Sequence, residues 1–267
     1  MITNTITLLP YENATLTAIC VSNTNELKMP PRRAVIVCPG GAYYGLADHE
    51  AEPVAWQFLA AGFATFVLRY GVKEGATDCA PLCQAALAVK HLREHATDYN
   101  IDPDHIFTCG FSAGGHLAGS AGVLWDLPEV RAVLGNAPEG IGRPNGMILC
   151  YPVISDDPSF GHRGSFRNLC GKQDPTPEET GKFSLEKHVN ATTPPAFIWH
   201  TCADTGVPVE NSLAMANAMV SAGVPVEMHI FPEGAHGWSL CSPLTGIDFP
   251  HNACWMELAV KWAGGLA

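Results

Sequence analysis

Basic residues are scarce in this sequence, which has 15 Lys and Arg against 26 Asp and Glu and a formal net charge of -11. Proteins that bind a nucleic acid backbone usually carry a stripe of positive charge, because neutralising phosphates supplies much of the affinity. The few basic residues here are spread thinly along the chain. We therefore expect no nucleic acid partner.

Long apolar runs are also missing. No stretch of 18 consecutive apolar residues occurs, so no segment is typical of a membrane-spanning helix. Residues 1–20 have neither the basic start nor the apolar run and cleavage site of a secretory signal. We therefore expect a cytoplasmic protein without a membrane partner.

The sequence also lacks a group of residues spaced like metal ligands, although it has ten cysteines. The cysteines are scattered through apolar segments such as VIVC (35–38) and MILC (147–150), as buried free thiols usually are. Cys79 and Cys83 are one helical turn apart, but no close pair of His or Cys supplies two further ligands. We predict reduced thiols in the core and no metal site.

What the sequence does contain is an alternation of short apolar runs with helical patterns. This alternation is typical of a parallel sheet built from βαβ units. No linker rich in glycine and serine interrupts it, so we predict one α/β domain over residues 1–267. The expected strands are TITLL (5–9), LTAICV (16–21), RAVIVC (33–38), FATFVLR (63–69), HIFTC (105–109), GMILCY (146–151), AFIWHT (196–201) and VEMHIF (226–231).

The segments between these strands divide into helices and one long irregular stretch. Residues 155–195 lie between two expected strands and are rich in Asp, Pro, Gly and Ser. Long loops in compact domains often cover active sites, so we predict that this segment is a cover loop. The expected helices are 50–61, 79–97 with Asp78 as its N-cap, 112–124, 209–222 and 252–264.

A serine between two glycines marks the first candidate for chemistry. In CGFSAGGHLAGSAGV (109–123), Ser112 stands between Gly110 and Gly114, where an expected strand turns sharply into an expected helix. Such a turn exposes the serine hydroxyl above the sheet edge, and the helix N-terminus favours negative charge developing there. We predict that Ser112 is a nucleophile; the alternative is a turn serine that only begins the helix.

A serine hydroxyl needs a base to accept its proton, and the base needs a carboxylate to orient it. In a parallel sheet, both should come from loops at the carboxyl ends of later strands. Asp204 follows the expected strand AFIWHT, and His236 follows VEMHIF. The order Ser, Asp, His is typical of hydrolases with this serine turn. We therefore predict a triad of Ser112, Asp204 and His236.

Other residues could fill two of these roles. His251 also follows the last expected strand, but it lies just before the final helix. His200 ends the strand before Asp204, and we expect it to pack in the sheet. Asp156 and Asp157 follow the preceding strand and remain alternative acids.

The loop after RAVIVC is the candidate for stabilising negative charge on a substrate oxygen. Its sequence CPGGAYYGLADHE (38–50) contains small residues that let backbone amides approach a ligand closely. We predict that the amides of Gly41 and Ala42, with that of Ala113 after the serine, form an oxyanion hole. The alternative is a glycine turn without such a role.

Four motifs together resemble the α/β-hydrolase superfamily, in particular its bacterial esterase and lipase-like branch, which includes acetyl-xylan esterases and relatives of hormone-sensitive lipase. They are PGGAY (39–43), GFSAGGHLA (110–118), PPAFIWHTCADTGVPVENS (194–212) and EGAHGWS (233–239). The resemblance covers about residues 30–265. It implies a mostly parallel eight-stranded sheet with helices on both faces, an acyl-enzyme intermediate and no cofactor.

Carried over residue by residue, the resemblance supports the site predicted above. Ser112 matches the nucleophile, Asp204 the acid and His236 the base, while Gly41, Ala42 and Ala113 match the oxyanion donors. The sequence departs from the pattern at position 39. Pro39 stands where many relatives have a histidine that is usually structural.

The composition of the cover loop bears on the substrate. SDDPSFGHRGS (155–165) and GKQDPTPEET (171–180) are mostly polar, which suits a small acyl group on a polar alcohol better than a long acyl chain. The resemblance implies deacetylation of small acetylated carbohydrates such as xylo-oligosaccharides. The alternatives are a generic short-chain carboxylesterase, a peptidase of the prolyl-oligopeptidase type and a hydrolase-fold binding protein without activity.

Overall fold

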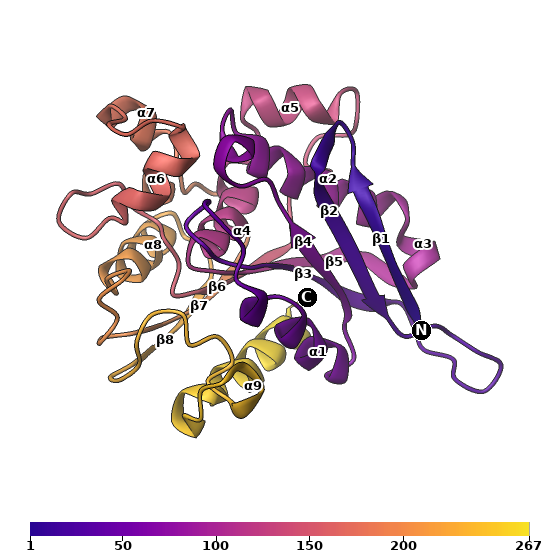
Figure 1. The fold of residues 1–267 in the computed structure, drawn as a ribbon. Helices are drawn as coiled ribbons and strands as arrows, with labels where there is room; N and C mark the ends of the chain where they lie inside the picture. The colour runs from indigo at the N-terminus through magenta and orange to yellow at the C-terminus, as the bar shows by residue number, and fades with distance from the viewer. Residues whose placement is uncertain (267) are drawn as a thin grey trace.

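An eight-stranded sheet runs through the centre of the molecule in the computed structural model, which describes residues 1–266 (Figure 1). The strand order is β1-β2-β4-β3-β5-β6-β7-β8. Strand β2 pairs antiparallel with β1 and β4, and all other neighbours are parallel. The predicted mostly parallel sheet of eight strands is confirmed. The strands are β1 (Ile2–Leu8), β2 (Tyr11–Cys20), β3 (Arg32–Cys38), β4 (Ala64–Arg69), β5 (Ile101–Phe111), β6 (Gly146–Cys150), β7 (Ala196–Thr201) and β8 (Val226–Phe231).

Helices cover both faces of the sheet, as predicted. On one face α1 and α9 pack together with the side chains of the central strands, and on the other face α2, α4 and α8 do so (Figure 1). The helices are α1 (Glu52–Ala60), α2 (Ala80–Glu94), α3 (Ala96–Tyr99), α4 (Ala113–Val123), α5 (Pro128–Leu134), α6 (Arg163–Cys170), α7 (Pro177–Gly181), α8 (Glu210–Ser221) and α9 (Pro250–Gly265). None of the helices in the described part of the chain is long and apolar enough to span a membrane.

Strand β3 shows why the central strands are apolar throughout. Ala34 and Ile36 pack into the core under α2 and α4, whereas Val35 and Val37 pack into the core under α1 and α9. Successive side chains of a strand point to opposite faces, so a strand with both faces covered needs apolar residues at every position. The sheet therefore divides the interior into two cores.

Two details of the helix predictions are wrong. Asp78 is not the N-cap of α2: the residue at that position is Cys79, in a left-handed conformation with φ of 60°, and no side chain caps the helix. Asp78 itself has φ of 55°, so the chain makes a tight turn just before the helix begins. The predicted helix 79–97 also ends early, and the short helix α3 follows it.

The segment 155–195 is not irregular throughout. It contains α6, α7 and the short 3₁₀ turn η3 (Leu185–Lys187), with α6 and α7 above α8 at the upper left of Figure 1. Thr176 and Glu179 form a capping box at the start of α7: each side chain accepts a hydrogen bond from the other residue's amide, at 3.3 and 2.9 Å. The sequence TPEE is a capping signal that the sequence analysis missed.

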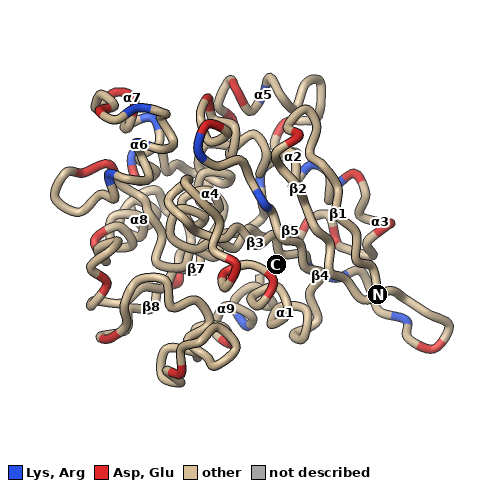
Figure 2. The backbone as a smooth tube through the Cα atoms, in the orientation of Figure 1, with Lys and Arg blue, Asp and Glu red and all other residues tan. Residues whose placement is uncertain are grey.

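The thiols follow the prediction in most positions. Seven cysteines are buried and Cys170 is half-buried, but Cys202 and Cys254 are exposed, so the prediction of core thiols is wrong for those two. Figure 2 shows that Lys and Arg are scattered along the backbone between acidic positions. The buried cysteines are Cys20, Cys38, Cys79, Cys83, Cys109, Cys150 and Cys241.

Candidate active site

Ser112 lies on a strained turn between β5 and α4. Its φ of 53° and ψ of -120° are unfavourable for a residue with a side chain. Two backbone hydrogen bonds of 3.0 Å hold the turn: the Ser112 amide donates to Cys150, and the Val153 amide donates to Ser112. The surrounding structure therefore fixes the serine in a conformation that a free chain avoids.

The glycines around the turn leave room for this conformation. A Cβ atom at Gly110 would collide with the carbonyl oxygen of Gly114, and one at Gly114 would collide with the carbonyl oxygens of Cys38 and Pro39. The start of α4 thus approaches the end of β3 more closely than a side chain allows.

A continuous chain of hydrogen bonds connects the three residues predicted as the triad. His236 Nε2 lies 2.8 Å from Ser112 Oγ, and His236 Nδ1 lies 2.7 Å from Asp204 Oδ2. Because an ionised carboxylate only accepts, Nδ1–H donates to Asp204 and Nε2 accepts from the serine hydroxyl. The structure brings these residues together from the carboxyl ends of β5, β7 and β8.

Asp204 is held as a carboxylate by several donors. It is only 5% exposed, and its Oδ1 accepts the amides of Gly206 and Val207 at 2.9 Å each. Burial alone would raise the pKa of Asp204, but hydrogen bonds from His200 and His236 and from the Val207 amide outweigh burial and hold the pKa far below its usual range. The acid is therefore ionised whenever His236 is able to act as a base.

The alternative base and acids lie outside the hydrogen-bonded chain of Ser112, His236 and Asp204. His251 is exposed, and its ring faces Phe231. Asp156 and Asp157 have hydrogen-bond partners inside the predicted cover segment (155–195), such as Lys187 for Asp156 and Ser159 for Asp157. None of these hydrogen bonds reaches His236.

His200 has a second contact besides its packing in the sheet. It is fully buried at the end of β7, where its Nε2 donates to the Val207 carbonyl at 2.9 Å and lies 3.3 Å from Asp204 Oδ2. Its Nδ1 accepts from the Ser212 hydroxyl at 2.8 Å. The expected packing is present, and the contact with Asp204 was not foreseen.

The loop after β3 lies against the serine. A Cβ atom at Gly40 would lie 3.0 Å from the Cβ of Ser112. Gly41 and Ala42 have φ of 128° and 55°, and among residues 1–266 their amides find no hydrogen-bond acceptor. Ala113 is the first residue of α4, where amides have no partner within the helix. All three predicted donors are thus free of hydrogen bonds within the loop and the helix.

A buried histidine that the sequence analysis passed over connects this loop to the cover segment. His116 is 1% exposed and lies one helical turn after Ser112. Its Nε2 donates to the Phe183 carbonyl, and its Nδ1 accepts from the Tyr43 hydroxyl, each at 2.7 Å. Burial lowers the pKa of His116 to about 4, so the ring is neutral near pH 7. Its sequence signal was weak, because a histidine inside an apolar helix most often only packs.

A second unforeseen histidine stands at the start of α6. His162 caps the helix, since its Nδ1 accepts the Ser165 amide at 3.2 Å. Burial lowers the pKa of His162, and positive charge on His236 lowers it further. Negative charge on Asp204 acts in the opposite direction.

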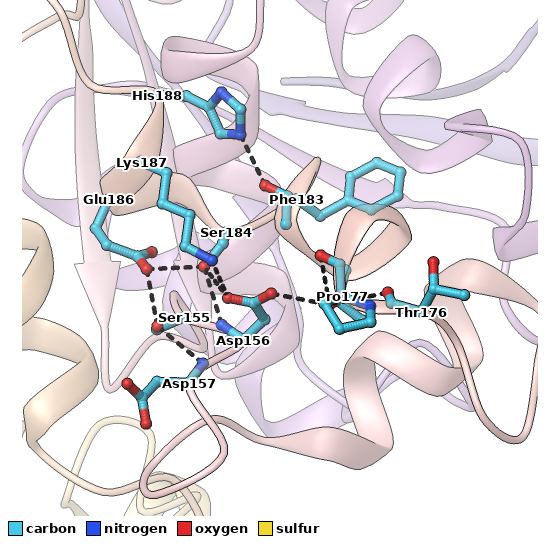
Figure 3. A network of polar contacts seen from close by, with 12 residues as sticks. Ser155, Asp156, Asp157, Thr176, Pro177, Phe183, Ser184, Glu186, Lys187 and His188 are labelled. Carbon is cyan, nitrogen blue, oxygen red and sulfur yellow. Dashed lines mark hydrogen bonds and ion pairs between the residues drawn. The ribbon is translucent and has the colours of Figure 1, made fainter.

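A pocket of about 570 Å³ lies within the cover segment. Its polar wall includes Asp156, which accepts hydrogen bonds from Ser184 and Lys187 (Figure 3) and also one from Thr180. Ser112, Asp204 and His236 are not among the residues that line this pocket. The pocket and the candidate triad are therefore separate features.

Comparisons with known proteins agree with this architecture. The BD-FAE family matches residues 22–138, and the prolyl oligopeptidase family matches residues 166–244. The crystal structure of an acetyl ester-xyloside bifunctional hydrolase from Caldicellulosiruptor lactoaceticus is 36% identical, with a TM-score of 0.84 over 97% of this chain and 94% of that one. The chain belongs to the esterase-like α/β-hydrolases. A second member, the carboxylesterase Cest-2923 from Lactobacillus plantarum, is 28% identical, with a TM-score of 0.84 over 99% and 97% of the two chains.

Longer proteins contain regions similar to this α/β-hydrolase. Endo-1,4-beta-xylanase B of Butyrivibrio fibrisolvens is 40% identical over 79% of this chain, and the acetylxylan esterase of Xylanibacter ruminicola is 33% identical over 78%. The chain spans 33% and 42%, respectively, of those two proteins.

Proposed function

We propose that the protein is a serine carboxylic-ester hydrolase in which Ser112 is the nucleophile, His236 the base and Asp204 the orienting acid. The observation that supports this most is the hydrogen-bonded chain from Asp204 through His236 to Ser112, on a turn that presents the serine at the sheet edge. The same connectivity activates serine in unrelated hydrolases, because it combines a nucleophile with a correctly oriented base.

The first half of the proposed reaction forms an acyl-enzyme. Ser112 Oγ attacks the carbonyl carbon of the ester while its proton moves to His236 Nε2. The carbonyl oxygen becomes an oxyanion, which the amides of Gly41, Ala42 and Ala113 stabilise. The carbon–oxygen bond to the alcohol then breaks, and His236 gives its proton to the leaving alcohol oxygen.

The second half releases the acid. A water molecule gives a proton to His236 and attacks the acyl carbon, and the second tetrahedral intermediate collapses as His236 returns that proton to Ser112. Asp204 remains ionised and stabilises the positively charged imidazole in both halves. Every proton has a carrier on the chain, so the proposed cycle needs no cofactor.

The proposed substrate is a small acetylated carbohydrate such as an acetylated xylo-oligosaccharide. Two relatives support this: one is named an acetylxylan esterase, and the other an acetyl ester-xyloside bifunctional hydrolase. The polar cover segment 155–195 also suits a polar alcohol. We propose that the reaction takes place in the cytoplasm, because the ten cysteines are free thiols. We also propose that residues 1–267 form one domain and that the segment 155–195 covers its active site.

An acyl-chain series tests the substrate. A closed acetyl pocket would oppose each longer chain with an overpacking penalty of about 1 to 3 kcal/mol, whereas an open apolar pocket would favour each methylene by about 0.8 kcal/mol. We expect kcat/KM for aryl esters to fall from acetyl to butyryl and to be nearly lost at octanoyl, while an acetylated xylo-oligosaccharide releases acetate. A rise towards octanoyl without acetate release would favour a generic carboxylesterase.

The control for this series is Ser112→Ala, which should abolish turnover and labelling by a fluorophosphonate probe without unfolding the protein. Substantial ester hydrolysis by this variant would show that Ser112 is not the nucleophile.

The match of residues 166–244 to the prolyl oligopeptidase family favours a second candidate, a serine peptidase. Peptide amides with proline before the scissile bond belong in the same panel. Turnover of these amides with a higher kcat/KM than acetyl esters would replace the esterase proposal, while Ser112, His236 and Asp204 would keep their roles.

A further inference from the structure

Glu50 is a buried carboxylate that the proposed reaction does not use. It ends the short 3₁₀ turn η1 (Asp48–Glu50), which closes the loop after β3 (38–50, here called the oxyanion loop), and it is 2% exposed. Among the described residues no Lys or Arg pairs with it, and the nearest cationic group, His49 Nε2, is 3.9 Å away. Burying a carboxylate without a cation opposes folding, so stability alone does not favour an acid at this position.

Both oxygens of Glu50 are occupied by groups from the candidate site. Oε2 accepts the Gly40 amide at 2.8 Å, and Oε1 accepts the Tyr151 hydroxyl at 2.7 Å. A Cβ atom at Gly40 would lie 2.6 Å from Oε2 and 3.0 Å from the Cβ of Ser112. The carboxylate therefore fixes the first amide of the oxyanion loop beside the nucleophile.

Tyr151 extends this connection to the loop that carries His236. Its hydroxyl oxygen accepts the Ser239 amide at 2.9 Å, and its ring lies edge-on to the His236 ring, with centroids 5.1 Å apart. Only one acceptor, Glu50, receives the Tyr151 proton. The oxyanion loop and the loop after β8 that carries His236, here called the base loop, are thus joined through one side chain.

A second pair of hydrogen bonds joins η1 to the same base loop. His49 Nε2 donates to the Gly237 carbonyl at 3.0 Å, and the Ser239 hydroxyl donates to the His49 carbonyl at 2.7 Å. Gly237 and Ser239 lie on the C-terminal side of His236. The turn that carries Glu50 is therefore bonded directly to the loop whose histidine must move a proton.

We propose that Glu50 is a positioning residue for the ester hydrolysis: it holds the oxyanion loop and the base loop in register, and its negative charge favours the positively charged His236 of the tetrahedral intermediate. This inference rests on the proposed function. Asp204 is the direct partner of the imidazole, and Glu50 supplies a second, fixed negative charge nearby. A preorganised charge in a site that excludes water stabilises a developing opposite charge more than water would.

Burial and hydrogen bonding act on the Glu50 carboxyl in opposite directions. Burial raises the pKa of Glu50 above its usual value, while hydrogen bonds from Tyr151 and Gly40 and positive charge on His49 and His236 act in the opposite direction. The net pKa is raised, so the hydrogen bonds from Tyr151 and Gly40 are what favour the carboxylate form that the proposal requires.

Glu50→Gln tests the charge, because it keeps the shape of the side chain. For a phenyl acetate ester we expect kcat to fall about tenfold to 100-fold, less than for loss of a direct oxyanion donor, with KM changed by less than about threefold. We also expect the acidic limb of the pH profile of kcat/KM to move to lower pH, because the base loses a neighbouring negative charge. Because Gly40 and Tyr151 both donate to Glu50, the new amide nitrogen faces one of these donors, and we expect a modestly lower melting temperature as well.

Tyr151→Phe tests the hydrogen-bonded connection between the two loops without removing the carboxylate of Glu50. It keeps the ring but removes the hydrogen bonds to Glu50 and Ser239, so we expect a lower kcat with the acidic limb unmoved. The matched control is Glu52→Gln, two residues along the chain, whose carboxylate binds Arg69 at 3.0 Å. This control should leave kcat and the pH profile unchanged.

The outcomes distinguish this inference from the proposed function. If Ser112→Ala kept its activity, the proposed function itself would fail. If Ser112→Ala is inactive but Glu50→Gln keeps wild-type kcat, or loses kcat only in parallel with melting temperature and with the acidic limb unmoved, Glu50 is not a positioning residue.

Discussion

The candidate catalytic centre and the cover segment are built from opposite kinds of polar interaction. At the centre, Asp204 and His116 are buried, and their partners are backbone groups, buried side chains or, for Asp204, the half-buried His236. In the cover segment, charged pairs reach the surface: Lys182 and Glu129 are both partly exposed, and Lys187 is 51% exposed although its partner Asp156 is 8% exposed. Salt screens exposed pairs but hardly reaches buried ones.

This difference separates what is fixed from what can change. A buried hydrogen-bonded group leaves an unsatisfied partner when it is replaced, so the centre tolerates few substitutions. A partly exposed pair contributes little, and water replaces it. The centre therefore depends on each of its buried contacts, whereas a partly exposed pair outside it can be exchanged at small cost.

The largest contrast should appear between two aspartates, one in each region. Asp204→Asn should lower kcat about 10⁴-fold, because the amide favours the wrong tautomer of His236. Asp156→Asn should change kcat for a small aryl acetate by less than about threefold, since its partners lie in the cover segment. Steady-state kinetics of both variants measure the contrast.

If Asp156 were the acid that orients the base, Asp156→Asn would show the large loss of kcat and Asp204→Asn the small one. The double variant of Asp204→Asn with His236→Ala provides an internal check. Its loss should be far smaller than the product of the two single losses, because residues that act as one unit are not additive.

A smaller effect should come from His116, which connects the two regions. The pKa of His116 is about 4 in the folded protein and about 6.5 in an unfolded chain, so the unfolded state binds the extra proton first as pH falls. The stabilisation from its neutral form is therefore complete above pH 6.5 and is lost between pH 6.5 and 4. Summed over that window, the free energy of unfolding should fall by roughly 3 kcal/mol.

Urea unfolding of wild type and His116→Gln at several pH values measures this effect. The variant should be less stable at pH 7, and its stability should fall less steeply towards pH 4. Parallel curves for the two proteins would mean that His116 does not titrate in this window.

The smallest effect should come from the ion pair that joins the cover segment to α5. Lys182 and Glu129 are 2.6 Å apart, and their side chains are 36% and 40% exposed. Glu129→Gln should lower the free energy of unfolding by less than about 1 kcal/mol in low salt, and the difference should disappear in 1 M salt. A larger loss that persists in high salt would show that the cover segment is held in the same way as the centre.

The same contrast explains how far the sequence could be interpreted. The sheet and the positions of Ser112, Asp204 and His236 follow from local patterns, because apolar strands are periodic and functional loops follow their carboxyl ends. Helix α7 was missed because PEETG is polar and buries no side chain, whereas α6 (RGSFRNLC) does place Phe166 and Leu169 on a buried face but is only eight residues long inside a polar segment.

The supporting residues could not be predicted for a different reason. Glu50 is buried against Tyr151, which is 101 positions away, and His116 donates to Phe183, 67 positions away. No local pattern records such partners. The N-cap prediction for α2 was wrong for a similar reason: aspartate is a common N-cap residue, but Asp78 lies in a turn with positive φ.

The buried free thiols can also report how often parts of the fold open locally. Cys38, Cys109 and Cys150 lie near the carboxyl ends of β3, β5 and β6 beneath the serine turn, while Cys202 and Cys254 face solvent. An alkylating reagent modifies exposed thiols at once, but it modifies buried ones only during transient excursions that uncover them. The order in which the buried thiols become modified would therefore rank the strands by how often each one opens, without introducing any new cysteine.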